Sequence, residues 1–141
     1  MSDNILTLLT PKALLVYLSD DMTIRQGLEK MRVHRYTAIP IVNEKTGEYV
    51  GSIAEGDLLY NIVKDEDVNV KKLENKKIIK LVRKKFMPAM KVDMSMDELI
   101  KLITIQNYVP IVDDRNILMG IVTRSSVMKY LVKKLDGTSN R

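Results

Sequence analysis

The feature that most constrains the fold of this chain is an internal repeat at an offset of about 70 residues. The segment from Leu14 to Val63 matches the segment from Met90 to Leu135 in the order of its apolar runs, turns and glycines. Each half is too small to bury both faces of a sheet and two helices by itself. The repeat therefore predicts a mixed α/β (α+β) fold. Two similar motifs are expected to pair about a pseudo-two-fold axis and to leave a cleft where they meet.

Each half is predicted to run strand, helix, strand, strand, helix. Capping boxes at Thr23–Gln26 and Ser95–Glu98 mark the starts of the first helices. The apolar residues that follow recur at helical spacing, as Ile24, Leu28 and Met31 and as Met96, Leu99, Ile100 and Ile103. The predicted strands cover 15–18, 38–42 and 49–53 in the first half and 90–92, 108–112 and 118–122 in the second. The last helix of each half is predicted to be amphipathic, with Leu58, Leu59 and Ile62 matching Val127, Met128 and Leu131.

Proline and glycine occur at matching places in the two halves. Pro40 and Pro110 lie inside predicted strands, and a proline has no N–H, so the usual ladder of hydrogen bonds cannot extend at that point. Gly51 and Gly120 follow in the next strand of each half. The repeat predicts a first motif with an N-terminal segment at 1–70, a basic linker at 71–85, and a second motif with a C-terminal tail at 86–141.

The net charge of +5 is concentrated between the halves, where eight lysines and arginines lie within Lys71–Lys85. Three interpretations stay open: a solvated linker helix, a contact for an anionic ligand or partner, and a nucleic-acid surface. One Phe and no Trp supply little surface for stacking bases, so nucleic-acid binding is the least favoured of the three.

The composition provides few groups for catalysis. Cysteine is absent and His34 is the only histidine, so a metal site or a nucleophile–base pair lacks its residues. His34 and Arg35 end the first predicted helix, where a cation complements the helix dipole and where a phosphate contact is the alternative. The acid pairs Asp20–Asp21 and Asp113–Asp114 fit turns better than acid–base chemistry. We expect no enzyme, no metal and no cofactor.

The apolar stretch Ile5–Leu9 is too short for a signal peptide, and Asp3 precedes it where a basic residue would be expected. No run approaches the ~20 apolar residues that span a bilayer. We therefore expect a cytoplasmic protein without a membrane span.

The two proline strands and the segments Gly51–Asp57 and Gly120–Ser126 resemble a tandem cystathionine-β-synthase (CBS) motif pair, the Bateman module, over most of the chain. The family pattern is Gly-h-h-Thr/Ser-x-x-Asp before the last helix, where h is apolar. The resemblance implies a regulatory module that binds adenosine derivatives, with the Thr and Asp contacting ribose and the helix N-terminus favouring phosphate. It also implies a homodimer and a partner protein that responds to the ligand.

This chain departs from the family pattern in both halves. The first half has Asp57 but carries Ala54 at the hydroxyl position, and the second has Thr123 but carries Ser126 at the acidic position. Thr-x-x-Asp is also simply a good helix N-terminus. A ribose held by Thr and Asp of one motif is therefore not favoured in either half.

A second constellation resembles the stand-alone bacterial CBS pairs that sense cyclic di-AMP. Its residues are Tyr36, Thr37, Ala38 and Ile39 before Pro40, together with Thr123 and Arg124, whose guanidinium could hold a phosphate. Val16 and Leu18 would form part of an apolar wall. The relatives often have a second arginine where this chain has Ser125. The resemblance thus implies cyclic di-AMP as ligand, or else AMP, ADP or ATP, and the alternative is a dimerisation module with degenerate pockets.

Overall fold

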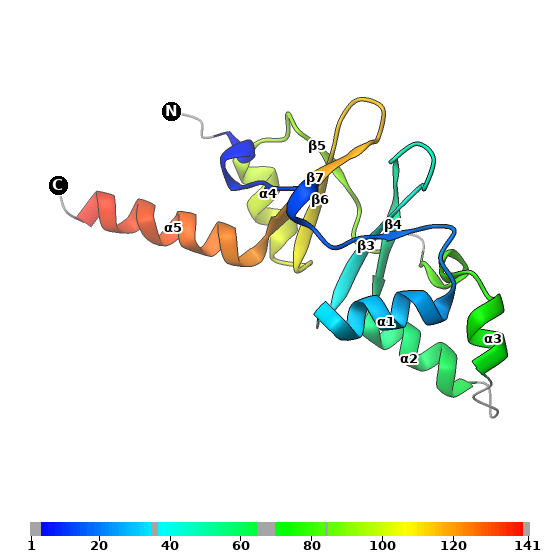
Figure 1. Cartoon of the computed structure of the whole chain (residues 1–141). Helices are drawn as coiled ribbons and strands as arrows, with labels where there is room; N and C mark the ends of the chain where they lie inside the picture. The colour runs from blue at the N-terminus through cyan, green and yellow to red at the C-terminus, as the bar shows by residue number, and fades with distance from the viewer. Residues whose placement is uncertain (1–3, 35–36, 65–69, 84, 140–141) are drawn as a thin grey trace. The chain divides into compact units, whose positions relative to one another are not determined.

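The computed structural model describes residues 4–34, 37–64, 70–83 and 85–139. They form two compact units, one comprising Val16–Phe86 and the other Met1–Leu15 together with Met87–Arg141. We call them the first-repeat unit and the second-repeat unit. Figure 1 shows that each has its own sheet and its own helices. The predicted mixed α/β fold of two similar halves is confirmed, while their pairing about a two-fold axis stays a prediction.

The first-repeat unit contains a three-stranded sheet in the order β2–β3–β4. Strand β2 (Leu18–Ser19) is parallel to β3 (Ala38–Val42), which is antiparallel to β4 (Tyr49–Ala54). Helices α1 (Ile24–His34) and α2 (Glu55–Lys64) follow β2 and β4. The short helix α3 (Val70–Asn75) and the 3-10 helix η3 (Ile78–Leu81) complete the unit.

The second-repeat unit repeats this order and adds one strand, giving the sheet β1–β7–β6–β5. Its strands are β1 (Thr10–Pro11), β5 (Met90–Lys91), β6 (Tyr108–Val112) and β7 (Leu118–Thr123). Its α-helices are α4 (Met96–Ile103) and α5 (Arg124–Ser139), and its 3-10 helices are η1 (Ile5–Leu8) and η2 (Lys12–Leu14).

The register of the strands repeats in detail. Pro40 lies opposite Ser52 and Pro110 opposite Ile121, and each hairpin has a register shift two residues after its proline. The short parallel strands pair only with residues beyond the prolines, because Leu18 lies beside Ile41 and Met90 beside Ile111. Each proline thus sits where its strand has no neighbour on one side, which is where a missing N–H can be tolerated. The predicted interruption of the ladder is confirmed on the side of the short parallel strand, while the antiparallel pairing runs through both prolines.

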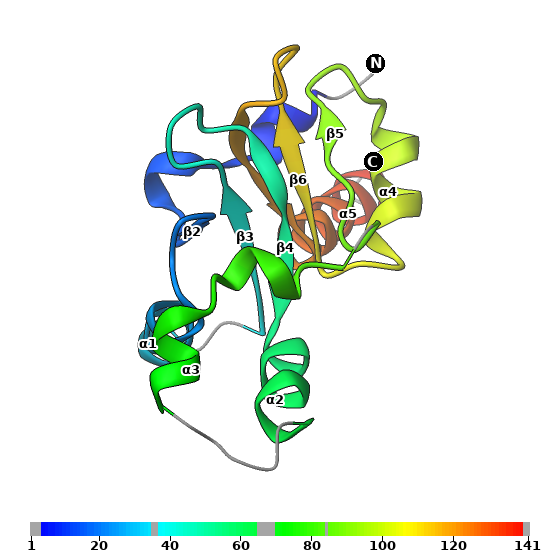
Figure 2. The same ribbon diagram turned by 90° about the vertical axis from the view of Figure 1, so that its right-hand side faces the viewer.

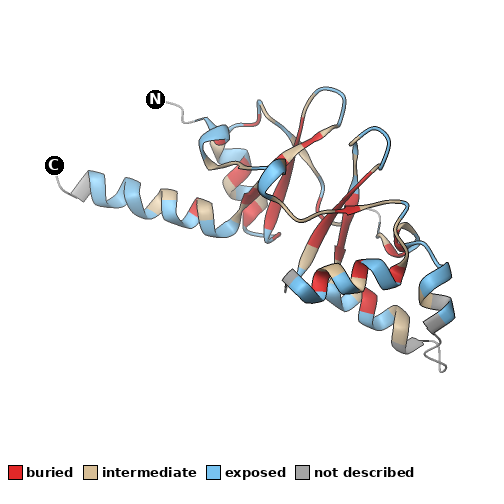
Figure 3. Cartoon of the chain, in the orientation of Figure 1, coloured by how far each residue is buried: buried red, intermediate tan, exposed pale blue. Residues whose placement is uncertain are grey.

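Each unit has its own apolar core, shown in red in Figure 3. The predicted helix faces are largely confirmed, since Ile24 and Met31 of α1 and Leu99 and Ile103 of α4 are buried. Leu58 and Val127 are buried as well, but Leu59 and Met128 are 63% and 58% exposed. These two residues lie off the core, because a helix turns by about 100° per residue and carries the next position off the buried face.

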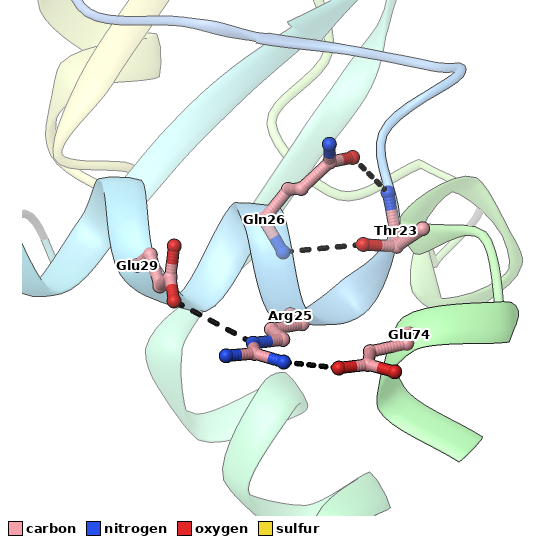
Figure 4. Close-up of polar contacts among 5 residues, drawn as sticks. All are labelled: Thr23, Arg25, Gln26, Glu29 and Glu74. Atoms are coloured by element: carbon pink, nitrogen blue, oxygen red, sulfur yellow. Dashed lines mark hydrogen bonds and ion pairs between the residues drawn. The ribbon is translucent and has the colours of Figure 1, made fainter. Parts of the chain in front are cut away.

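The capping box at the start of α1 is complete (Figure 4). The Thr23 N–H donates to Gln26 Oε1 at 2.9 Å, and the Gln26 N–H donates to Thr23 Oγ1 at 3.2 Å. Arg25 pairs with Glu29 at 3.6 Å and also with Glu74 of α3, which ties the linker to α1. In the second-repeat unit, Ser95 Oγ accepts from the Glu98 N–H at 3.1 Å.

The segments before the two repeats pack in corresponding places, which the sequence did not reveal. Ile5 of η1 is buried in the core of the second-repeat unit, and Ile78 of η3 in that of the first-repeat unit. A Cβ on Gly120 would lie 2.2 Å from the carbonyl oxygen of Thr10, and a Cβ on Gly51 would lie 2.6 Å from Cγ1 of Val82. Both glycines therefore admit a covering chain at close range.

This packing differs from the division at 1–70, 71–85 and 86–141, which follows the repeats along the sequence. The N-terminal segment belongs to the compact unit of the second repeat, and the linker to that of the first. Figure 2 shows α3 and the segment after it, in green, near α1 and the β3–β4 hairpin. Lys71, Lys76, Lys77 and Lys80 are exposed there, as a solvated segment requires, but Ile78 and Leu81 are buried.

Candidate functional site

The candidate residues lie at two strand-to-helix junctions, β4–α2 in the first-repeat unit and β7–α5 in the second-repeat unit. At the first junction the Glu55 N–H donates to the carbonyl of Thr37, and at the second the Arg124 N–H donates to that of Asn107, both at 2.9 Å. Ala38 lies opposite Ala54 just as Tyr108 lies opposite Thr123. The two junctions are therefore equivalent in structure, and their side chains can be compared position by position.

Asp57 and Thr123 both cap helices. The Ala54 N–H donates to Asp57 Oδ2 at 3.4 Å, which satisfies the first free N–H of α2 from the third helical position. Thr123 Oγ1 accepts from the Ser126 N–H at 3.1 Å and shares a hydrogen bond with Ser126 Oγ at 2.9 Å. Each junction thus has one half of a capping box, the acid at Asp57 and the hydroxyl at Thr123. Both residues of the Thr-x-x-Asp pattern that the chain retains therefore have a structural role as helix caps.

The carboxylate of Asp57 has a charged partner of its own. Arg83 Nε lies 3.0 Å from Asp57 Oδ1, and the Arg83 guanidinium lies over the Phe86 ring at 4.3 Å. The Asp57 side chain is 19% exposed, which leaves only a part of it open to solvent. A ribose at Asp57 would have to share the carboxylate with Arg83, and this ion pair was not visible in the sequence.

Arg124 opens α5 and reaches to the end of α4. Its Nε donates to the carbonyl of Ile103 at 3.0 Å, where a cation complements the negative end of the helix dipole. This bond orients the guanidinium, and within the described part of the chain its terminal nitrogens have no protein partner. The residue is exposed. Arg124 is therefore both a structural contact and a fixed cation with free donors.

The apolar candidates divide by burial. Leu18 and Ile39 are fully buried and belong to the core of the first-repeat unit, with Val16 partly buried against it. Ala38 is half-buried at the start of β3, and Thr37 is exposed just before it. Tyr36 lies outside the described residues. The structure brings Thr37, Ala38 and Asp57 to one junction and Thr123 and Arg124 to the other, while the joining of the two groups stays a prediction.

The described residues contain no group of three or more side chains that could hold a metal ion. None of the helices in the described ranges is both long enough and apolar enough to cross a membrane.

The two repeats, their matched proline strands and their capped strand-to-helix junctions define a tandem-repeat α/β architecture. The CBS domain family matches residues 2–64 and 78–133. The chain therefore belongs to the CBS domain family and carries two copies of its motif.

Curated relatives come from archaea. A protein of Methanopyrus kandleri, named as the uncharacterized protein MK0525, is 32% identical over 116 residues, which is 76% of this chain and 54% of the relative. The uncharacterized protein MJ1225 of Methanocaldococcus jannaschii is 26% identical over 125 residues, which is 81% of this chain and 44% of the relative. The chain thus spans about half the length of the curated relatives that it matches.

Solved structures share the fold over nearly the whole chain. CbpB in complex with c-di-AMP matches with a TM-score of 0.88 and 18% identity, covering 98% of this chain and 90% of that one. CbpB of Listeria monocytogenes with c-di-AMP has a TM-score of 0.82 and 18% identity, with 94% and 97% covered. CBSX2 in complex with AMP has a TM-score of 0.73 and 20% identity, with 92% and 96% covered.

Proposed function

We propose that this chain is a regulatory module that binds an adenine nucleotide between its two CBS motifs and passes the signal to a partner protein. Cyclic di-AMP is the ligand that we favour, with AMP, ADP and ATP as the other candidates. The observation that carries this proposal is the shared fold with CbpB, whose structure holds c-di-AMP. A catalytic role and a resident cofactor are not part of the proposal.

The proposed contacts come from both repeats. Tyr36, Thr37 and Ala38 would face the base, and Thr123 and Arg124 would face the phosphate. Arg124 supports this assignment because its bond to the Ile103 carbonyl fixes the guanidinium and leaves the terminal nitrogens for an anion. Val16, Leu18 and Ile39 support the site from the core, since two of them are fully buried. Asp57 would contribute a carboxylate that it shares with Arg83.

Isothermal titration with cyclic di-AMP, AMP, ADP, ATP and adenosine tests the proposal. We expect one of the nucleotides to bind, and Arg124→Ala to weaken that nucleotide by about tenfold or more while adenosine is little affected. Lys101→Ala is a matched control, because Lys101 is an exposed cation of the same unit. No binding of any nucleotide at millimolar concentration would contradict the proposal, and equal losses for nucleotide and adenosine would remove Arg124 from the phosphate site.

A dimerisation module with degenerate pockets is the second candidate. It is favoured by the use of Asp57 and Thr123 as helix caps. It is also favoured by apolar side chains left exposed on the last helices, namely Leu59 and Tyr60 of α2 and Met128, Val132 and Leu135 of α5. A second copy of the chain is the partner that we propose for them. This candidate predicts a dimer by light scattering and no thermal shift with any nucleotide, whereas a ligand at 100 times its Kd should add about 2.7 kcal/mol.

A further inference from the structure

A cavity of about 390 Å³ lies within the second-repeat unit, between the N-terminal segment and α5. Its wall includes Thr7 and Thr10 from the N-terminal side, and from α5 it includes Ser126, Lys129, Tyr130 and Lys133. Sites for small molecules commonly enclose about 300–1,000 Å³. The cavity therefore has room for a small ligand, and its wall carries hydroxyls and two ammonium groups.

The first-repeat unit shows which residues occupy the corresponding position in the other repeat. Leu9 and Val82 each follow a four-residue 3-10 helix and each lie against the glycine of a strand, so Thr10 corresponds to Arg83. Ser126 corresponds to Asp57, because both are the third residue of the helix after that strand. Arg83 and Asp57 span the gap with an ion pair of 3.0 Å. Thr10 and Ser126 are too short to do so, which leaves the second-repeat unit open there.

Within the described ranges of the chain, the two ammonium groups on the cavity wall have no carboxylate partner. Lys129 and Lys133 are one turn apart on α5, and like charges at this spacing repel. An anion held between them would relieve the repulsion and accept charge-assisted hydrogen bonds.

We propose that this cavity is a second binding site, for a small phosphorylated anion. Lys129 and Lys133 supply the charge, and the hydroxyls of Thr10 and Ser126 lie on the wall where further oxygens can be held. The site shares no residue with the proposed nucleotide contacts Tyr36–Ala38, Thr123 and Arg124, so it goes beyond the proposed function.

Tripolyphosphate is the probe for the first test, with affinity measured by titration calorimetry and location by amide chemical shifts. We expect shifts at 7–10 and 126–133. The double variant Lys129→Gln, Lys133→Gln should raise Kd by about tenfold or more. Lys101→Gln removes an exposed helical lysine of the same unit outside the cavity, and it should change Kd by less than about twofold. Equal losses in the double variant and in Lys101→Gln would overturn the proposal.

The second test closes the cavity without changing the net charge. The double variant Thr10→Arg, Ser126→Asp introduces the ion pair that the first-repeat unit has at the same positions. We expect it to fold, as judged by its circular dichroism and melting temperature, and to lose tripolyphosphate binding by about tenfold or more. Unchanged binding in this variant would show that the cavity is not the site. Binding of a DNA or RNA oligomer is the alternative use of the two lysines. If Lys129→Gln, Lys133→Gln weakens that binding and the cavity variant does not, the lysines belong to a nucleic-acid surface and the proposal is overturned.

Discussion

At the scale of single residues, the glycine of β7 shows how one missing side chain sets a packing arrangement. Gly120 lies against β1, and the nearest atoms to a Cβ built there are the Thr10 carbonyl oxygen at 2.2 Å and the Leu9 side chain at 3.0 Å. A backbone oxygen cannot move aside as a flexible side chain can. Any larger residue therefore has to displace the N-terminal segment from the sheet.

We expect Gly120→Ala to destabilise the protein by about 1–3 kcal/mol in urea unfolding, because overpacking forces the backbone to shift. Gly137→Ala is the matched control, since no atom lies within 4 Å of its Cβ position on α5. It should be neutral or stabilise by up to about 1 kcal/mol, because alanine is the better helix residue. Equal effects of the two substitutions would mean that β1 does not need the close approach.

Tyr49 is a second residue whose surroundings set its chemistry. Burial raises the pKa of Tyr49 to about 12, and the hydrogen bond with Ser52 at 2.8 Å opposes that shift. The folded state therefore holds the phenol proton more tightly than the unfolded state, whose pKa is about 10. The resulting stability is fully present below pH ~10 and is lost as the pH rises toward 12.

Ultraviolet absorbance titration should include a late tyrosine ionisation that Tyr49→Phe removes. The substitution should cost about 0.5–1.5 kcal/mol at neutral pH, because it deletes the part-buried hydrogen bond with Ser52. A titration curve unchanged by the substitution would contradict the assignment.

Residue chemistry was only partly predictable. The turn interpretation is confirmed for Asp113, which accepts from the N–H groups of Arg115 and Ile117. Asp20 instead accepts from Asn43 Nδ2 and the Glu44 N–H, in a turn that lies far along the chain. Backbone N–H donation by Ile117 and then by Arg115 lowers the pKa of Asp113. The partner of Asp57 was not predicted, because Arg83 is distant in sequence and no spacing rule connects the two.

At the scale of elements, local signals set the helix starts. The box at Thr23–Gln26 forms as predicted, with each residue satisfying the backbone N–H of the other. Its position fixes where α1 begins and hence which residues of α1 enter the core.

Thr23→Ala should cost about 1 kcal/mol of stability, and the loss should couple to Gln26→Ala in a double-mutant cycle. Arg25→Ala is the control on the same turn. Its ion pairs with Glu29 and Glu74 are half exposed, so the cost should stay below about 1 kcal/mol. Additive effects of Thr23→Ala and Gln26→Ala would show that the two bonds are independent.

At the scale of the whole molecule, the segment that precedes each repeat packs in the compact unit of the other repeat. Ile5 is 2% exposed in the core of the second-repeat unit, although more than half of the chain separates it from Met87. Ile78 has the corresponding place in the first-repeat unit. The first-repeat unit is one continuous segment that extends past its repeat to Phe86, whereas the second-repeat unit is built from two segments.

Ile5→Ala should therefore destabilise the second-repeat unit, by about 2–5 kcal/mol as for other fully buried aliphatic side chains. Hydrogen exchange should accelerate in β6, β7 and α4, which share that core. Leu6→Ala, at a residue 42% exposed on the same turn, should change stability by less than about 1 kcal/mol. Protection unchanged in β6 and β7 would show that the N-terminal segment is not part of that core.

The sequence by itself determined the repeat, the order of strands and helices, the interruption at each proline and the caps, because these depend on residues close together in the chain. It also supplied the family resemblance. The tertiary structure decided what the local pattern could not. The N-terminal segment packs with the second repeat, and Arg83 forms an ion pair with Asp57. At the corresponding position of the second-repeat unit, a cavity lies beside Ser126. These contacts join segments far apart in sequence. A short apolar run such as Ile5–Leu9 is too short to show a periodicity, so its local pattern does not predict the segment against which it packs. That packing partner is determined by the burial of apolar side chains from distant parts of the chain.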